Sequence, residues 1–400
     1  MRKTVLIGTI LFLLSNFAFS ADSNPRNDRP LVGAIRWDAW YGNIADRDLP
    51  SPANRPGIPP EKVPGPNPGA ETLRSLSPDQ FAWRRPFFAK HDPKGNLIEL
   101  NGNRQEIMDQ EIDYAARAGL DFWAFTVYPE DCPLSFCLKK YLSSAKRNKI
   151  DFCFFLVLGS AYGRFVDDPA MQEYVLKYIT EPGYLKVQGN RPVIYVGFFD
   201  EQIKKQMIDG FWKKYCDRIK AKGLGEPYVV ICNSRKPKAA NELREKLGAD
   251  ALGAYTFANS LLEGAPYSAL CELSENFVKD CIDQGIDVSA PCSAGWDRRP
   301  RSLNPVSWGK SHKKGEFIEQ YYQSGTPDEI AAHIGRNVEM LRRHPNKSGV
   351  NLALIYAWNE CDEGGWLIPT LDPPHGQGTQ RIDALRKILR PNEDPILPSD

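Results

Sequence analysis

The chain has 400 residues, of which 42% are apolar and 25% are charged, and these values are typical of a folded globular protein. The formal net charge is +1. Because no basic excess is available to neutralise phosphates, nucleic-acid binding is not expected.

Residues 1–20 have the pattern of a secretory signal peptide. A basic start at Arg2 and Lys3 precedes the apolar run Val5–Phe19, and small residues come just before Ala21. The run is shorter than the roughly 20 residues that a transmembrane helix needs, although a membrane anchor is the alternative interpretation. We therefore expect cleavage before Ala21 and export to the periplasm or the medium. The expected mature protein is one domain over 21–390 with a Pro-rich tail over 391–400, and it has no membrane span.

Short apolar runs recur along the chain and predict buried parallel strands. Helical patterns separate them, and Gly119 and Gly223 stand where helices are expected to end. The predicted strands are Leu31–Trp37, Phe122–Tyr128, Phe152–Leu158, Pro192–Phe198, Tyr228–Asn233, Ala251–Thr256, Val288–Cys292 and Leu352–Trp358. The predicted helices are Arg104–Ala118, Leu134–Asn148, Pro169–Ile179, Glu201–Lys222, Lys236–Leu247, Tyr267–Gln284, Pro327–Arg343 and Gln377–Leu389.

This alternation predicts an α/β fold, a single (β/α)8 TIM barrel. A doubly wound open sheet is the alternative, but the sequence contains no GxGxxG or Walker loop that would support it. Two strand-to-helix loops are long, Asp38–Asn103 and Ser293–Thr326. Loops of this kind rise on the C-terminal face of a barrel, where active sites are built. We expect them to wall a cleft, the alternative being surface insertions without function.

Three carboxylates follow the last predicted strand within four residues: Glu360, Asp362 and Glu363. Crowded like charges at a barrel mouth raise the pKa of at least one carboxyl group, which places an acid beside a base. Cleavage of a glycosidic bond needs such a pair. A calcium loop or a solvated acidic turn is the alternative, but a DxDxDG pattern is absent.

Three segments, residues 359–364, 295–301 and 118–128, resemble motifs of glycoside hydrolase family 99 and its WbsX-like clan. Residues 359–364 read Asn-Glu-Cys-Asp-Glu-Gly and are similar to the clan signature Asn-Glu-Trp-x-Glu-Gly. Residues 295–301, Gly-Trp-Asp-Arg-Arg-Pro-Arg, resemble the clan segment Gly-Trp-Asp-Asn-x-Pro-Arg. Residues 118–128 are similar to the second strand of the clan. The resemblance implies a (β/α)8 barrel that hydrolyses a poly- or oligosaccharide with retention of configuration and without a metal or other cofactor.

The resemblance also implies roles for the two glutamates. Glu360 would be the base that acts on the 2-hydroxyl group of the sugar, and Glu363 the general acid and then base. Cys361 stands where the clan usually has Trp, which keeps open a catalytically inactive carbohydrate-binding barrel as the alternative. A glycosyltransferase is a third possibility, against which the signal peptide argues.

Polar and aromatic residues near the predicted strand ends are candidate substrate contacts. Tyr and Trp offer apolar faces for sugar rings, and charged or amide side chains bind hydroxyl groups. For Arg36 and Asp38, the alternative to a sugar contact is an internal ion pair. For Asp297, the alternative is an ion pair with an arginine that anchors the loop. The predicted substrate-binding residues are Arg36, Asp38, Tyr128, Tyr255, Trp296, Asp297, Trp358, Asn359 and Trp366.

The nine cysteines and five histidines contain no CxxC, no HExxH and no zinc-type spacing, so no metal site is predicted. Cys132 and Cys137 lie close together in a chain expected to be exported, and whether they form a disulfide stays open.

Overall fold

The computed structural model describes residues 29–43, 67–160, 163–258, 263–309, 313–371 and 378–392. The predicted signal peptide and residues 393–400 of the predicted tail lie outside these ranges. Within them, parallel strands form one sheet in the order β12-β11-β10-β6-β5-β1-β14-β13. Their bounds are β1 Leu31–Arg36, β5 Phe122–Thr126, β6 Asp151–Val157, β10 Arg191–Gly197, β11 Tyr228–Cys232, β12 Ala251–Leu252, β13 Ser289–Ser293 and β14 Leu352–Tyr356.

The two ends of this sheet meet and close it. Leu252 of β12 forms a parallel bridge with Val288, directly before β13, and its N–H donates to the carbonyl of Asp287 at 2.9 Å. On the opposite side, β1 pairs with both β5 and β14, with Gly33 opposite Phe122 and Leu354. The predicted (β/α)8 barrel is therefore confirmed. Each predicted strand overlaps an observed one, although β12 is only Ala251–Leu252 where Ala251–Thr256 was predicted.

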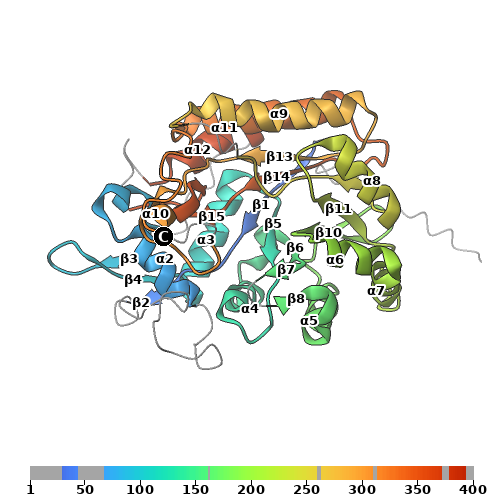
Figure 1. Ribbon diagram of the computed structural model, residues 1–400, viewed down its shortest axis with the longest axis horizontal. Coiled ribbons are helices and arrows are strands. Elements are labelled where there is room, and N and C mark those ends of the chain that lie inside the picture. The colour runs from blue at the N-terminus through green and yellow to red at the C-terminus, as the bar shows by residue number, and fades with distance from the viewer. Residues whose placement is uncertain are drawn as a thin grey trace, which may run out of the picture.

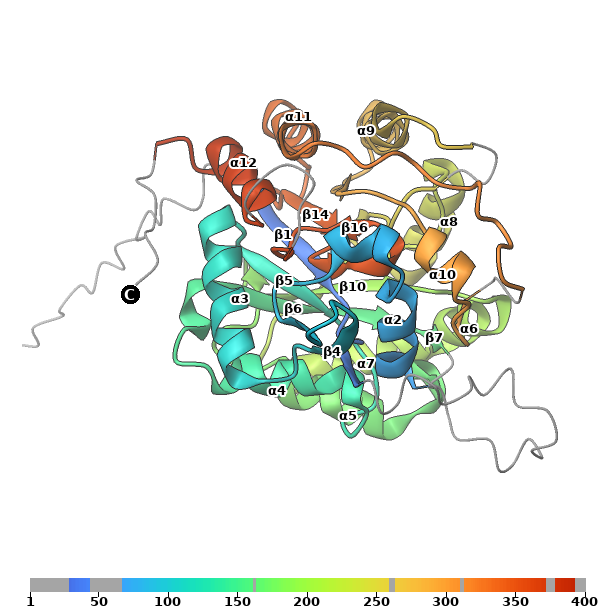
Figure 2. The same cartoon turned by 90° about the vertical axis from the view of Figure 1, so that its left-hand side faces the viewer.

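Helices surround the strands, as Figure 1 shows from the side and Figure 2 along the helices α9 and α11. They are α3 Gln105–Ala118, α4 Phe136–Ser143, α5 Pro169–Tyr178, α6 Glu201–Gln206, α7 Trp212–Lys220, α8 Pro237–Leu247, α9 Tyr267–Asp283, α11 Pro327–Arg343 and α12 Gln380–Leu389. Their ends have local causes. Thr326 and Glu329 form a capping box at the start of α11, and Gly119 ends α3 with a φ of 85°, which favours glycine.

Two predicted helices differ from the observed ones. The helix predicted over Leu134–Asn148 is only α4, because 3-10 turns at Pro133–Ser135 and Arg147–Lys149 flank it. The helix predicted over Glu201–Lys222 is divided into α6 and α7 by a π-helical turn, Met207–Phe211, in which Gly210 has a φ of 112°.

The two long loops contain structure of their own. The first holds β2 Tyr41–Asn43, α2 Pro68–Leu76, the 3-10 turn η4 Asp79–Arg84, β3 Ala89–His91 and β4 Leu97–Asn101, and its strands form the antiparallel sheet β2-β4-β3. The second holds α10 Arg299–Leu303. In Figure 2, α2 and α10 lie over the end of the barrel that faces the viewer. That end is the C-terminal face, because both loops follow the C-terminal ends of strands.

Short strands and turns complete the fold. They are β7 Gly159–Ser160, β8 Gly163–Arg164, η7 Phe165–Asp167, β9 Lys186–Val187, β15 Asn359–Glu360, η9 Cys361–Glu363 and β16 Gly365–Trp366. The barrel interior is packed with side chains, and the ring of Tyr195 stacks between Phe122 and Phe155 with centroids 6.4 and 6.1 Å away. None of the helices in the described part of the chain is both long and apolar enough to cross a membrane.

Candidate active site

The two candidate catalytic glutamates lie on a tight hairpin after β14. β15 pairs with β16 across the 3-10 turn η9, so that Glu360 precedes the turn and Glu363 closes it. Gly364 follows with a φ of 87°, and a Cβ there would lie 2.4 Å from the backbone nitrogen of Asp297. The N–H of Asp297 donates to the carbonyl of Glu363 at 2.6 Å. The hairpin is thereby fixed against the loop after β13.

Arg301 of α10 holds all three carboxylates of the hairpin. Its Nη1 lies 2.5 Å from Glu363 and its Nη2 3.3 Å from Glu360. Its Nε and Nη2 donate to Asp362 at 2.7 and 2.9 Å. Because Asp362 is fully buried and Arg301 is 5% exposed, these contacts are screened little by water. One guanidinium group therefore faces three carboxyl groups, and this imbalance favours retention of a proton by one of them.

Among these three carboxyl groups, Glu360 has a raised pKa. Burial, with the charges of Glu363 and Asp362, raises its pKa to about 8, although Arg301 and the hydroxyl group of Tyr255 act in the opposite direction. Tyr255 donates to Glu360 Oε1 at 2.8 Å. At neutral pH, the carboxyl group of Glu360 therefore keeps its proton.

Glu363 has different surroundings. Besides Arg301, it receives a hydrogen bond of 2.5 Å from the hydroxyl group of Tyr356 and lies 3.4 Å from Nε of Arg298. Two guanidinium groups and a hydroxyl donor stabilise negative charge on this carboxylate. The two carboxyl groups thus have different surroundings, which is the asymmetry that acid–base catalysis requires.

A cavity of about 890 Å³ opens in front of this pair. The predicted residues Tyr128, Tyr255, Trp296, Glu360 and Glu363 all line it. The ring of Tyr255 packs on Tyr356 with centroids 5.4 Å apart, and Trp296 packs on the other side of Tyr356 at 5.7 Å. Tyr255 and Trp296 line the cavity and form an aromatic wall beside the two carboxyl groups, and the buried ring of Tyr356 packs against both of them.

Four predicted contacts do not line this cavity but form a buried network beside it. Arg36 is 1% exposed and pairs with Asp38 and Glu111, so the alternative interpretation of an internal ion pair holds. Burial raises the pKa of Asp38 to about 6. Trp358 is fully buried, and its indole N–H donates to Glu111 at 2.7 Å. Asn359 accepts from the N–H of Trp37 and donates to Asp38, at 2.9 and 3.2 Å. The polar atoms of these four side chains therefore form hydrogen bonds and ion pairs with other groups of the protein.

Asp297 and Trp366 also lie outside the residues that line the cavity. Asp297 is 3% exposed and pairs with Arg84 and Arg299. Burial raises its pKa, but these ion pairs outweigh burial and lower it overall. The guanidinium group of Arg381 stacks 3.6 Å from the centroid of Trp366, which is 3% exposed. Asp297 thus has the loop-anchoring role given as its alternative, and Trp366 is buried against Arg381 rather than open to the cavity.

Several lining residues had no place among the predicted contacts. Trp37 stands at the end of β1, Trp308 and Phe317 come from the second long loop, and Phe198 and Arg235 follow β10 and β11. Arg301 was noticeable only as one of three arginines in the motif over 295–301. The motif gave no indication that Arg301 turns toward the carboxylates while Arg299 pairs with Asp297.

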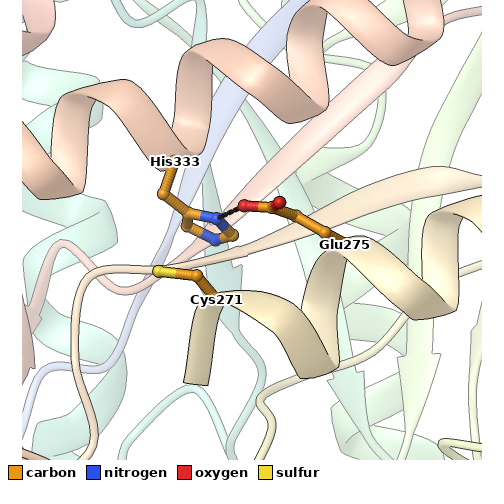
Figure 3. Close-up of side chains that lie close together, drawn as sticks. All are labelled: Cys271, Glu275 and His333. Carbon is orange, nitrogen blue, oxygen red and sulfur yellow. Dashed lines mark hydrogen bonds and ion pairs between the residues drawn. The ribbon is translucent and has the colours of Figure 1, made fainter. Parts of the chain in front are cut away.

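One group of potential metal ligands occurs among the described residues, outside the cavity. Figure 3 shows Cys271 and Glu275 of α9 facing His333 of α11. Nδ1 of His333 lies 2.7 Å from Glu275, and Nε2 accepts from the N–H of Ser293 at 3.1 Å. Both ring nitrogens are therefore engaged with protein atoms, and this arrangement fits a histidine that anchors the end of β13 better than it fits a metal ligand. All nine cysteines are free thiols, including Cys132 and Cys137.

Comparison with known proteins places the fold among glycoside hydrolases. The chain is similar to the GH99 endo-alpha-mannosidase from Bacteroides thetaiotaomicron, with a TM-score of 0.53, 14% identity, and coverage of 88% of this chain and 95% of that one. It is also similar to a glycoside hydrolase-like protein, with a TM-score of 0.50, 11% identity, and coverage of 91% and 94%. No protein-family model and no curated protein matches the sequence. The resemblance to family 99 noted in the sequence is thus confirmed at the level of the fold.

Proposed function

We propose that this protein is an exported glycoside hydrolase that cleaves a poly- or oligosaccharide with Glu360 and Glu363, with retention of configuration. The observation that carries the proposal is the pair itself. Glu360, whose pKa is raised, and Glu363 both contact Arg301 at the mouth of a barrel, in a cavity lined by aromatic residues. The motif resemblance and the similarity of the fold to the GH99 endo-alpha-mannosidase support the same reaction class.

The proposed chemistry follows from the two carboxyl groups. One carboxyl group donates a proton to the leaving oxygen, and the other acts as base, as glycosidic cleavage requires. In the roles that the resemblance implies, Glu360 takes the proton of the 2-hydroxyl group, whose oxygen attacks C1 of the sugar while Glu363 protonates the departing oxygen. Water then opens the resulting three-membered ring at C1 and gives its proton to Glu363, while Glu360 returns a proton to O2. These roles begin with the proton on Glu363, so the proton that Glu360 holds in the free site has to pass to Glu363 when the substrate binds.

Neighbouring residues prepare the pair for this reaction. Arg301 limits the repulsion between the carboxylates, while Tyr255 and Tyr356 fix the orientation of one glutamate each. The aromatic wall offers the apolar face on which a sugar ring stacks. Such preorganisation lowers the barrier because no dipole has to reorient during the reaction.

A release screen tests the proposal. The mature protein is incubated with plant, algal, fungal and host polysaccharides, including α-mannans because of the mannosidase neighbour, and the products are identified by mass. The proposal expects oligosaccharide release by the wild type and a loss of at least about 100-fold in the Glu363→Gln variant. Glycan binding without release, equal in both proteins, would instead support the alternative of a catalytically inactive carbohydrate-binding barrel.

A further inference from the structure

Two phenylalanines line the cavity with much of their side chain open to solvent. Phe198 is 47% exposed and Phe317 is 43% exposed, and both are among the few large apolar residues that are exposed in the described part of the chain. Leaving apolar surface in water is unfavourable. Their shared position at one cavity is therefore a feature that folding alone does not explain.

The backbone at both residues is also unfavourable. Phe198 has a φ of 62° and Phe317 a φ of 60°, and the only other non-glycine residue with positive φ in the described ranges is Asn190. Asn tolerates the left-handed conformation, whereas a bulky aromatic residue does not. Strained conformations of this kind concentrate at ligand-binding positions. Exposure and strain thus coincide at the same two side chains.

The two rings come from different parts of the cavity mouth. Phe198 directly follows β10, whereas Phe317 belongs to the loop after β13, and β11 and β12 lie between these strands in the barrel. The ring of Phe198 packs edge-on against Tyr255 with centroids 5.1 Å apart, and Tyr255 donates to Glu360. Phe198 therefore extends the aromatic wall outward from the carboxyl pair.

We propose that Phe198 and Phe317 are two sugar-binding platforms that hold separate units of one glycan chain across the cavity. The proposal rests on the glycosidase function proposed above and deepens it, because it makes the substrate a chain of several sugar units. A pyranose ring has an apolar C–H face and a polar rim. The C–H face stacks on an aromatic ring, whose face carries negative charge density.

The rest of the lining fits the polar rim of such a chain. Arg235, Arg298 and Gln320 line the same cavity and provide hydrogen-bond donors beside the rings. A guanidinium group has five N–H donors, so Arg235, which donates to the carbonyl of Ala258, and Arg298, which pairs with Glu363, keep further donors for hydroxyl groups. The cavity, at about 890 Å³, lies toward the upper end of the roughly 300–1,000 Å³ of ordinary ligand pockets and has room for more than one ring.

Substitution by Asn tests the platforms, because Asn removes the ring and still accepts the left-handed backbone. The variants are Phe198→Asn, Phe317→Asn and the double variant, and Ile388→Gln is the control because Ile388 is 45% exposed on α12 and does not line the cavity. Binding is measured by calorimetry with size-fractionated oligosaccharides of two to eight units from mannan, laminarin, xyloglucan and carrageenan. Thermal midpoints confirm that the variants fold.

For a glycan that the wild type binds, we expect affinity to rise with chain length. Each single variant should weaken binding of the longer chains by about tenfold, and the double variant by about a hundredfold, because two separate positions contribute additively. The control should bind as the wild type does.

Two results would overturn the inference. Equal affinity of the wild type and both single variants at every chain length contradicts it while leaving the proposed hydrolase intact. A double variant no weaker than a single one contradicts the claim of two positions. Binding that depends on both rings without any glycan release would support the platforms and count against hydrolysis. Failure of the wild type to bind any of the four glycans contradicts both proposals.

Discussion

At the scale of single residues, the site depends on the balance between three carboxylates and the arginines beside them, of which Arg301 contacts all three. Arg301 contacts Glu360, Asp362 and Glu363 within a region almost closed to water. Breaking a buried ion pair by removing one partner is costly, because the remaining charges stay buried without compensation. Arg301 is therefore expected to matter both for stability and for the acidity of the pair.

Replacing Arg301 with Gln tests this role. We expect a loss of about 3–5 kcal/mol in the free energy of unfolding and at least about 100-fold in kcat/KM. The raised pKa of Glu360 should move further up, because the positive charge of Arg301 that lowers it is gone. Arg299→Gln is the matched control, since Arg299 is one-third exposed and pairs with Asp297. Denaturant unfolding and a pH–rate profile are the measurements, and equal effects of the two substitutions would refute the role of Arg301.

The raised pKa of Glu360 also predicts how stability depends on pH. The carboxyl group of Glu360 has a pKa of about 8 in the folded protein, above its usual value of 4.5. Between these values the folded state holds a proton that the unfolded state has lost, so the free energy of unfolding falls as pH rises from about 4.5 to 8. Glu360→Gln keeps a neutral side chain and should remove this contribution. Its thermal midpoint should decline less than that of the wild type between pH 5 and pH 8, and identical declines would count against the assignment.

At the scale of elements, the hairpin after β14 is held by parts of both long loops. Ser75 of α2 donates to Asp362 at 3.2 Å, and Glu71 of α2 accepts from the hydroxyl group of Ser307 in the second loop at 3.0 Å. The backbones of residues 295–297 and 363–364 approach so closely that side chains would not fit at Gly295 or Gly364. The geometry of the carboxyl pair therefore depends on contacts between segments far apart in sequence.

Two glycine substitutions distinguish the effect of this close approach from the effect of a left-handed backbone alone. Gly364 and Gly248 both have positive φ, but a Cβ at Gly248 would meet nothing within 4 Å. Gly248→Ala should cost about 1 kcal/mol through its left-handed backbone alone. Gly364→Ala should cost several times more and lower kcat/KM at least about tenfold, because the loop after β13 is pushed away from the carboxyl groups. Equal stability and activity of the two variants would disprove the proposed link between the loops and the site.

The elements were largely predictable, and the contacts between them were not. Continuous apolar runs and helix-ending residues such as Gly119 are local signals, and they were sufficient for the eight strands and most of the helices. The π-helical turn around Gly210 and the inward turn of Arg301 depend on packing partners that the local pattern does not contain. Trp358 and Trp366 were predicted as sugar contacts because they flank the acidic cluster, yet both are buried behind it. Phe198 looked like the end of an ordinary strand, since no local signal distinguishes an exposed ring from a buried one.

At the scale of the whole molecule, the protein is a closed barrel with a net charge of +1. Its two long loops lie at one face, the C-terminal face of the barrel. The eight strands bring segments from the entire chain to that face, which is why residues as distant as Phe198 and Glu363 line one cavity. Export, which we propose from the pattern over residues 1–20, would bring this face into contact with extracellular or periplasmic glycans.

The export proposal has a direct test. When the full chain is expressed in a bacterium with a general secretion pathway, the mature protein should be recovered outside the cytoplasm with Ala21 at its N-terminus. Replacing Leu11 and Leu13 with charged residues should leave the uncleaved chain in the cytoplasm. Intact-mass analysis of the cell fractions is the measurement, and a cytoplasmic chain that retains residues 1–20 without these substitutions would refute the proposal.

The central claim is hydrolysis at Glu360 and Glu363, and isotope incorporation during glycan release tests it most directly. The wild type, Glu360→Gln, Glu363→Gln and the control Arg299→Gln are incubated in ¹⁸O-labelled water with a polysaccharide from which the wild type releases fragments. We predict one ¹⁸O atom at the new reducing end of each fragment made by the wild type and the control, and at least about 100-fold less labelled product with either glutamate variant. Labelled product from both glutamate variants at the wild-type rate would contradict the assignment of the site, and unlabelled fragments from the wild type would contradict hydrolysis itself.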